Sequence, residues 1–206
     1  MKDVFRREAA VRDGVVSAWA LVAAGMTRHA IANHTQGLRR VHDGVWVTGD
    51  APITRRQLWW AAVLTAPGRA LSHASAGAAY GFRPWDGGFE VVVQHGNGGP
   101  RRFGPLLVCR AKRFDATTLK GLPITTAEQT LAHLWPKLND QQRRKMLREA
   151  LRLRTTTAAA IAAGPGPSSL RQVSLRYQRL QLHRCKSDET PGEPARRRTS
   201  AGPTAG

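Results

Sequence analysis

The chain has 206 residues, a formal net charge of +18 and only two cysteines, Cys109 and Cys185. Its length suits one ordinary domain, or two small domains with a tail. The cysteines show neither metal-ligand spacing nor a disulfide framework, which argues against a disulfide-stapled secreted scaffold. The excess of Lys and Arg favours a polyanionic partner, most often nucleic acid, although GC-rich coding also raises the Arg content without any binding role.

The positive charge is unevenly distributed along the chain. The net charge is +2 over residues 1–50, +9 over residues 51–150 and +7 over residues 151–206. Net charge alone therefore does not locate a binding site. No signal peptide is visible, and the apolar stretch Ala18–Ala24 is too short to span a bilayer. We therefore expect a soluble cytoplasmic protein with no membrane association.

The first 50 residues predict three helices. The predicted helices are Lys2–Val11, Ala18–Ala24 and a third that runs to about Gln36. Ser17 and Thr27 are expected to cap the second and third helices, because their hydroxyls can accept a hydrogen bond from a free amide of the first turn. Gly25 ends the second helix. A helix, a short turn with glycine and a second helix form the layout of a helix-turn-helix.

A β-hairpin is predicted directly after these helices. The short strands Leu38–Val41 and Val45–Val47 flank Asp43-Gly44, which is a strong signal for a two-residue turn. Together with the preceding helices, the hairpin predicts a winged helix-turn-helix DNA-binding domain over residues 1–50.

Residues 51–163 predict an α/β region. Its predicted elements are the helices Thr54–Thr65, Ser72–Tyr80, a helix capped by Thr125 and ending near Leu134, and a helix capped by Asp140, with strands at Phe89–Gln94 and Leu106–Arg110 and a loop at Gly96–Gly99. Trp59 and Trp60 are adjacent on a helix, so one is expected in the core and the other at an interface. Mixed helices with few strands indicate the α+β class.

The C-terminal part changes in composition. Gly164-Pro165-Gly166-Pro167 is typical of a linker, and Ser168–Leu182 has the character of a basic helix. Residues 187–206 are rich in Ser, Pro, Gly, Thr and Arg and have almost no large apolar residue. We therefore expect residues 164–206 to be a largely disordered tail.

The third helix carries the predicted DNA-reading residues. Ile31, Thr35 and Leu38 share one face and are expected to pack inward. The residues expected to contact DNA are Thr27, Arg28, His29, Asn33 and Gln36 on this helix and Arg39, Arg40 and His42 on the hairpin. Arg pairs well with guanine, Asn and Gln pair with adenine, and basic residues beside the wing suit phosphates. The alternative is that these are solvated polar residues of a small helical domain.

Several motifs in combination resemble the AbiEi-type antitoxin family. They are Gly14–Ser17, Ala24–Ile31 and Leu38–Trp46 in the first region, and Ala70–Ala76, Tyr80–Phe82 and Gly121–Thr126 in the second. The match covers about residues 10–160. The resemblance implies a winged-helix protein that represses its own operon through an upstream operator. It also implies an antitoxin of a type IV system, which counteracts a nucleotidyltransferase-like toxin without a stable complex between the two proteins.

Two other classes of function stay open. Many actinobacterial relatives continue into a restriction-type nuclease domain, so the chain could be a degenerate member that has lost this domain. Beyond residue 150 the only acids are Asp188, Glu189 and Glu193, which lack a strand context that would hold a divalent cation. We therefore expect no catalytic residues, no metal site and no cofactor. The third class is a basic scaffold that binds nucleic acid without sequence preference.

Overall fold

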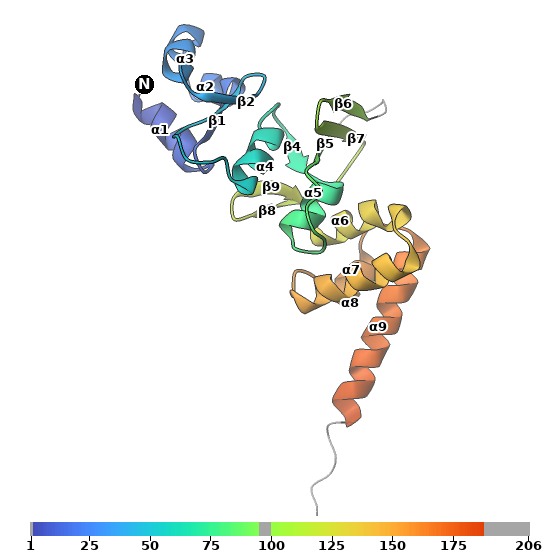
Figure 1. The fold of residues 1–206 in the computed structure, drawn as a ribbon. Coiled ribbons are helices and arrows are strands. Elements are labelled where there is room, and N and C mark those ends of the chain that lie inside the picture. Colours follow the sequence, from blue (N-terminus) through green and yellow to red (C-terminus); the bar gives the residue numbers. More distant parts are fainter. Residues whose placement is uncertain (1, 95–99, 188–206) are drawn as a thin grey trace, which may run out of the picture.

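A computed structural model describes residues 2–94 and 100–187, with side chains described up to residue 178. The predicted loop at Gly96–Gly99 and the predicted disorder beyond residue 187 lie outside the described residues. The fold is mixed α+β, as predicted. Figure 1 shows a small N-terminal unit at one end, a sheet in the middle, and a group of helices from which the last helix projects.

The N-terminal module, residues 2–47, contains three helices and a small sheet. Its elements are α1 (Lys2–Ala10), β1 (Val15–Ser17), α2 (Ala18–Ala23), α3 (Arg28–Thr35), β2 (Arg39–His42) and β3 (Val45–Val47). The strands form an antiparallel sheet in the order β1-β3-β2. The predicted caps are confirmed: Ser17 Oγ accepts from the Ala20 amide at 3.4 Å, and Thr27 Oγ1 accepts from the Ala30 amide at 3.2 Å.

Strand β1 was not predicted from the sequence. It is three residues long, and its adjacent residues Val15 and Val16 face opposite sides of the small sheet. Val16 packs with Leu21 and Ile31 beneath the three helices. Val15 faces the other way, into the core that the module shares with the rest of the chain. The small sheet is therefore covered on both faces.

A six-stranded sheet forms the centre of the molecule. Its elements and the helices around it are α4 (Arg55–Val63), β4 (Arg69–Leu71), α5 (His73–Ala79), β5 (Phe89–Gln94), β6 (Arg101–Phe103), β7 (Leu106–Ala111), β8 (Ala116–Leu119), β9 (Leu122–Thr125) and α6 (Ala127–Leu134). The strand order is β6-β7-β5-β4-β9-β8. The β4–β9 and β5–β7 pairs are parallel and the other pairs are antiparallel. The prediction of few strands was therefore wrong, because four of these six strands are only three or four residues long.

Helix α4 lies between the N-terminal module and the central sheet. Trp59 and Trp60 are both buried, with 9% and 4% of their surfaces exposed. The expectation that one of them faces an interface was wrong. Two adjacent residues point to different sides of a helix, but here one core contains α4, Val15 and Val47 of the module, and Val91 of the central sheet.

Two predicted helix caps are corrected by the structure. Thr126, not Thr125, caps α6, and its hydroxyl accepts from the Gln129 amide at 3.2 Å. Thr125 ends β9, is buried, and shares a hydrogen bond of 2.7 Å with the Thr130 hydroxyl. Asn139, not Asp140, caps the next helix. Ser72 stands at the cap position of α5, but its side chain makes no capping hydrogen bond.

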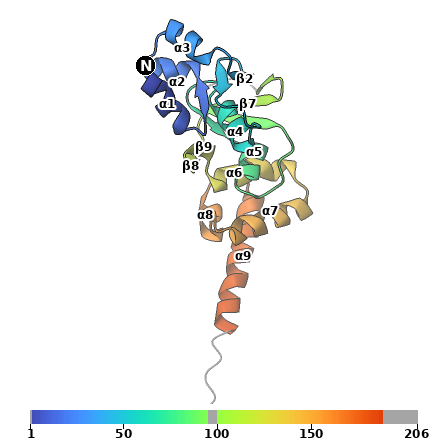
Figure 2. The same ribbon diagram turned by 60° about the vertical axis from the view of Figure 1, so that its left-hand side comes forward.

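The C-terminal helices form a second core. They are the 3-10 turn Trp135–Lys137, α7 (Asp140–Arg152), α8 (Ala158–Ala163) and α9 (Ser168–Ser187). Leu170 and Ser174 of α9 are fully buried, and Ser174 Oγ donates to the Ala158 carbonyl oxygen at 2.6 Å. The expected start of the tail at residue 164 is therefore too early. The first half of α9 belongs to the folded body, from which the helix then projects (Figures 1 and 2).

Candidate nucleic-acid interface

The outer face of α3 is polar and exposed. Arg28, His29, Asn33 and Gln36 are exposed, whereas Ile31 and Thr35 on the opposite side are only 5% and 7% exposed. The prediction is therefore confirmed for Ile31 and Thr35, whereas Leu38 follows the helix and is only half-buried. Three side chains on α3, and Gln36 at its C-cap, can thus form hydrogen bonds outside the core.

Two of these outward side chains are paired with each other. Asn33 Nδ2 lies 3.2 Å from His29 Nε2, one helical turn away. Because the pair is exposed, an incoming hydrogen-bonding partner can replace it at little cost. On the inward side, Thr35 Oγ1 donates to the Ile31 carbonyl oxygen at 2.9 Å and is not available to a ligand.

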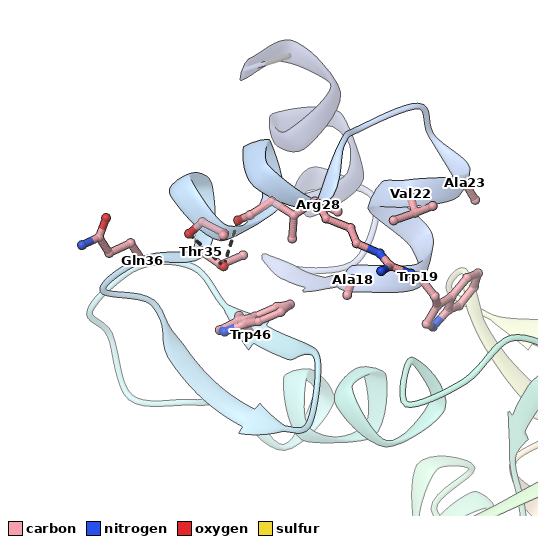
Figure 3. A pocket seen from close by; sticks show the side chains of 10 residues that line it. Ala18, Trp19, Val22, Ala23, Arg28, Thr35, Gln36 and Trp46 are labelled. Carbon is pink, nitrogen blue, oxygen red and sulfur yellow. Dashed lines mark hydrogen bonds between the residues drawn. The ribbon is translucent and has the colours of Figure 1, made fainter.

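Arg28 is placed differently from the other three. It is the first residue of α3, and its side chain extends across to α2 and lines a groove there (Figure 3). No hydrogen bond or ion pair to its guanidinium is found among the described residues. Arg28 is therefore a free cation at the edge of the outer face of α3, directed toward a neighbouring apolar surface.

The two arginines of the β2–β3 hairpin have different surroundings. Arg40 is 60% exposed and pairs with Asp43 across the turn. Arg39 donates from Nη2 to the carbonyl oxygens of Gly49 (2.9 Å) and Ala51 (2.6 Å), and so holds the segment that follows β3. Arg40 is thus available to a phosphate, because an exposed ion pair contributes little. Arg39 has a structural role in addition to its charge.

His42 does not join the exposed set. Its ring makes an edge contact with Phe89 of the central sheet, with centroids 6.2 Å apart. Burial, and secondarily the charge of Arg69, lower the pKa of His42. The lowered pKa favours the neutral form of the imidazole, which binds a phosphate less strongly than the cation would. The side chain joins the hairpin to the central sheet, and its contact with DNA remains a prediction.

Sequence reasoning missed the groove that Arg28 lines. It has a volume of about 820 Å³ and lies between α2, α3 and β3. Its remaining lining residues are Ala18, Trp19, Val22, Ala23, Ile31, Ala32, Thr35, Gln36 and Trp46. A signal for it was present in the sequence. Helix α2 is apolar all round, so its six residues offer more apolar surface than one buried face requires.

Comparison of the chain with protein-family models and with curated proteins gives no significant match in either case. Within residues 2–94 and 100–187, none of the helices is both long enough and apolar enough to cross a membrane. In the same described part of the chain, no three His, Cys, Asp or Glu side chains are grouped so that they could hold a metal ion.

Proposed function

We propose that the chain is a DNA-binding transcriptional regulator and that its N-terminal module is a winged helix-turn-helix. The element order α1-β1-α2-α3-β2-β3 supports this proposal, as does the antiparallel sheet that places β3 between β1 and β2. In this arrangement α3 is the helix that enters the major groove, and the β2–β3 hairpin is the wing.

The outer face of α3 is the observation that carries the proposal. His29, Asn33 and Gln36 contribute nothing to the core, yet each can exchange hydrogen bonds with base edges. Asn and Gln suit adenine, and Arg28 suits guanine if its side chain turns outward from the groove. Thr27 caps the helix end, where the first-turn amides and the helix dipole favour a phosphate. Arg40 on the wing supplies a further phosphate contact.

We further propose that this regulator is the antitoxin of a type IV toxin-antitoxin system and represses its own operon. This part of the proposal rests on the resemblance to the AbiEi-type family. Its partners would be an operator upstream of its own gene and, functionally, a nucleotidyltransferase-like toxin. A reading frame for such a toxin beside this gene would support the antitoxin role, and restored growth on co-expression of the two genes would test it.

The DNA-binding proposal is tested by titrating the full chain against two duplexes of equal length and base composition. One duplex is the region upstream of its own gene, and the other is a scrambled version of it. The titration is carried out at two salt concentrations, because a chain of charge +18 binds any DNA at low salt. We expect the upstream duplex to bind at least about 1,000-fold more tightly at the higher salt. Equal affinity for both duplexes at each salt concentration would instead indicate a non-specific basic scaffold.

A further inference from the structure

The groove beside α3 is an open apolar surface with a single charge. Trp46 of β3 lies on one side of it, and Trp19 and Val22 of α2 lie on the other (Figure 3); Ile31 of α3 is a further lining residue. Val22 is 50% exposed, which is unusual for a residue of its size. The indole nitrogen of Trp19 donates to the Leu64 carbonyl oxygen at 2.7 Å and so fixes this ring at the groove.

Among the described residues that line the groove, Arg28 alone is charged. Its guanidinium has no partner among the described residues and is directed along the groove toward α2 (Figure 3). A cation at the edge of an apolar surface with two indole rings selects a ligand with a flat or aliphatic apolar body and one negative group. A carboxylate suits the guanidinium best, because it can accept two parallel N–H hydrogen bonds.

We propose that this groove binds a small apolar carboxylic acid, with its body between Trp19 and Trp46 and its carboxylate on Arg28. A volume of about 820 Å³ is within the usual range for a small-molecule site. A second copy of the chain is a weaker candidate for this occupant. Two-fold pairing of the grooves would bring the two Arg28 side chains together without an acid in the lining to balance them.

The proposal has a consequence for DNA binding, which rests on the proposed function. Arg28 cannot hold a carboxylate in the groove and contact a guanine edge at the same time. An acid that occupies the groove therefore removes one base contact of α3 and weakens operator binding. By linkage, operator DNA weakens binding of the acid by the same factor. The groove would act as an inducer site.

The first test measures ligand binding in the absence of DNA. The probes are naphthalene-1-acetate and naphthalene-1-ethanol, which share an apolar body and differ in charge, and calorimetry on the full chain measures both. We expect the acid to bind about tenfold or more tightly than the alcohol. Arg28→Gln should abolish this preference, and Val22→Trp should block both probes by filling the groove. Arg171→Gln, which removes an exposed arginine of α9, is the matched control and should bind as the wild type does.

Three results would overturn the proposal: neither probe binds, both bind equally well, or Arg28→Gln keeps the preference for the acid. If the probes fail to bind and Val22→Trp converts a dimer to a monomer in sedimentation, the groove is a self-association surface instead. Circular dichroism and thermal melting verify that each variant is folded. Arg28→Gln changes only an exposed side chain, so the test does not depend on whether Val22→Trp folds.

The second test adds the upstream duplex. At a concentration ten times its own Kd, the acid should raise the apparent Kd for this duplex about four- to tenfold, and the alcohol should have a much smaller effect. If the acid binds but the chain shows no preference for the upstream duplex, the proposed function fails and the ligand site stands. If sequence-specific binding is present but the acid leaves it unchanged, only the inducer role is refuted, and the proposed function is retained.

Discussion

The imidazole rings of His73 and His133 stack face to face, with centroids 4.2 Å apart and planes 9° from parallel. His73 begins α5 and has a left-handed backbone, with φ of +47°. His133 lies on α6, and its Nε2 is 2.8 Å from the side-chain amide nitrogen of Gln129. The amide donates to this nitrogen, so the contact favours the neutral form of His133. Two neutral rings thus join neighbouring helices.

This pair makes the fold sensitive to acid. Burial, followed by the charges of His133 and Lys137, lowers the pKa of His73 to about 3, and burial and Lys137 also lower the pKa of His133. Well above pH 6.5, the ordinary pKa of histidine, the two rings are neutral whether the chain is folded or unfolded. As the pH falls below 6.5, the unfolded chain takes up protons that the folded chain excludes, so stability decreases by up to about 1.4 kcal/mol per pH unit for each histidine.

His73→Asn removes one titrating group and keeps a residue that tolerates a left-handed backbone. We expect the wild type to lose about 2 kcal/mol more stability than this variant between about pH 6.5 and pH 5. Urea unfolding at these pH values measures the difference. His29→Asn is the matched control, because His29 is exposed and lies far from the stacked pair. Parallel pH profiles for the wild type and His73→Asn would contradict the prediction.

Arg28→Ala tests base reading by α3. Removing a bidentate contact to guanine should cost about 1–3 kcal/mol of operator binding and relax the preference at one base position. Anisotropy titrations against duplexes substituted at each position in turn locate this position. A uniform loss of affinity on every sequence would show instead that Arg28 contacts phosphate.

Arg40→Ala and Arg39→Ala should separate a phosphate contact from a structural contact. Loss of Arg40 should weaken binding to all sequences alike and lower the slope of log K against log salt by about one unit. Arg39→Ala should also reduce stability by about 1 kcal/mol, because it releases the Gly49 and Ala51 carbonyl groups. Salt titrations and urea unfolding of both variants measure the two effects. The distinction fails if Arg40→Ala is destabilised as much as Arg39→Ala.

Leu170→Ala tests whether α9 belongs to the folded body. Leu170 is fully buried in the second core, so its truncation should cost about 2–5 kcal/mol of stability. Leu175 lies five residues further along the same helix and is 43% exposed. Leu175→Ala should therefore change the free energy of unfolding by less than about 1 kcal/mol. Equal effects of the two substitutions would show that the helix does not pack as described.

Gly14→Ala should destabilise the N-terminal module more than Gly25→Ala does. Both glycines have positive φ, +82° and +89°, so both substitutions strain the backbone by about 1 kcal/mol. A Cβ at Gly14 would also lie 2.7 Å from Thr48 Oγ1, whereas a Cβ at Gly25 meets nothing within 4 Å. We expect a total cost of about 2–3 kcal/mol at Gly14, measured by thermal melting. Similar melting temperatures for the two variants would mean that Thr48 moves aside freely.

The N-terminal module was the most predictable part of the fold. Ser17, Gly25 and Thr27 act through local backbone chemistry, which a sequence displays directly. Elsewhere, two adjacent residues that can both cap a helix made the predicted start of the helix less precise. Where Thr125 precedes Thr126, either can cap a helix in isolation, and the pairing of β9 decides between them. Strands of three residues, such as β4, are too short to show an alternating pattern.

The candidate site was predicted in part. Exposure of Arg28, His29, Asn33 and Gln36 follows from helical spacing alone. The position of His42 does not, because the contact that buries it comes from Phe89, which is distant in the sequence. The apolar composition of α2 signals a surplus of apolar surface, but not the groove itself, because Trp19 and Trp46 line one groove only once α2, α3 and β3 have come together. Local rules identify which residues face outward, but not which elements meet.

The burial of α4 between two sheets has a consequence for the unfolding of the chain. A fragment that ends at residue 50 would expose Val15, Val45 and Val47, which pack against this helix in the shared core. The N-terminal module and the central sheet should therefore melt in a single cooperative transition. Any ligand of the module, operator DNA included, then raises the melting temperature of the central sheet as well.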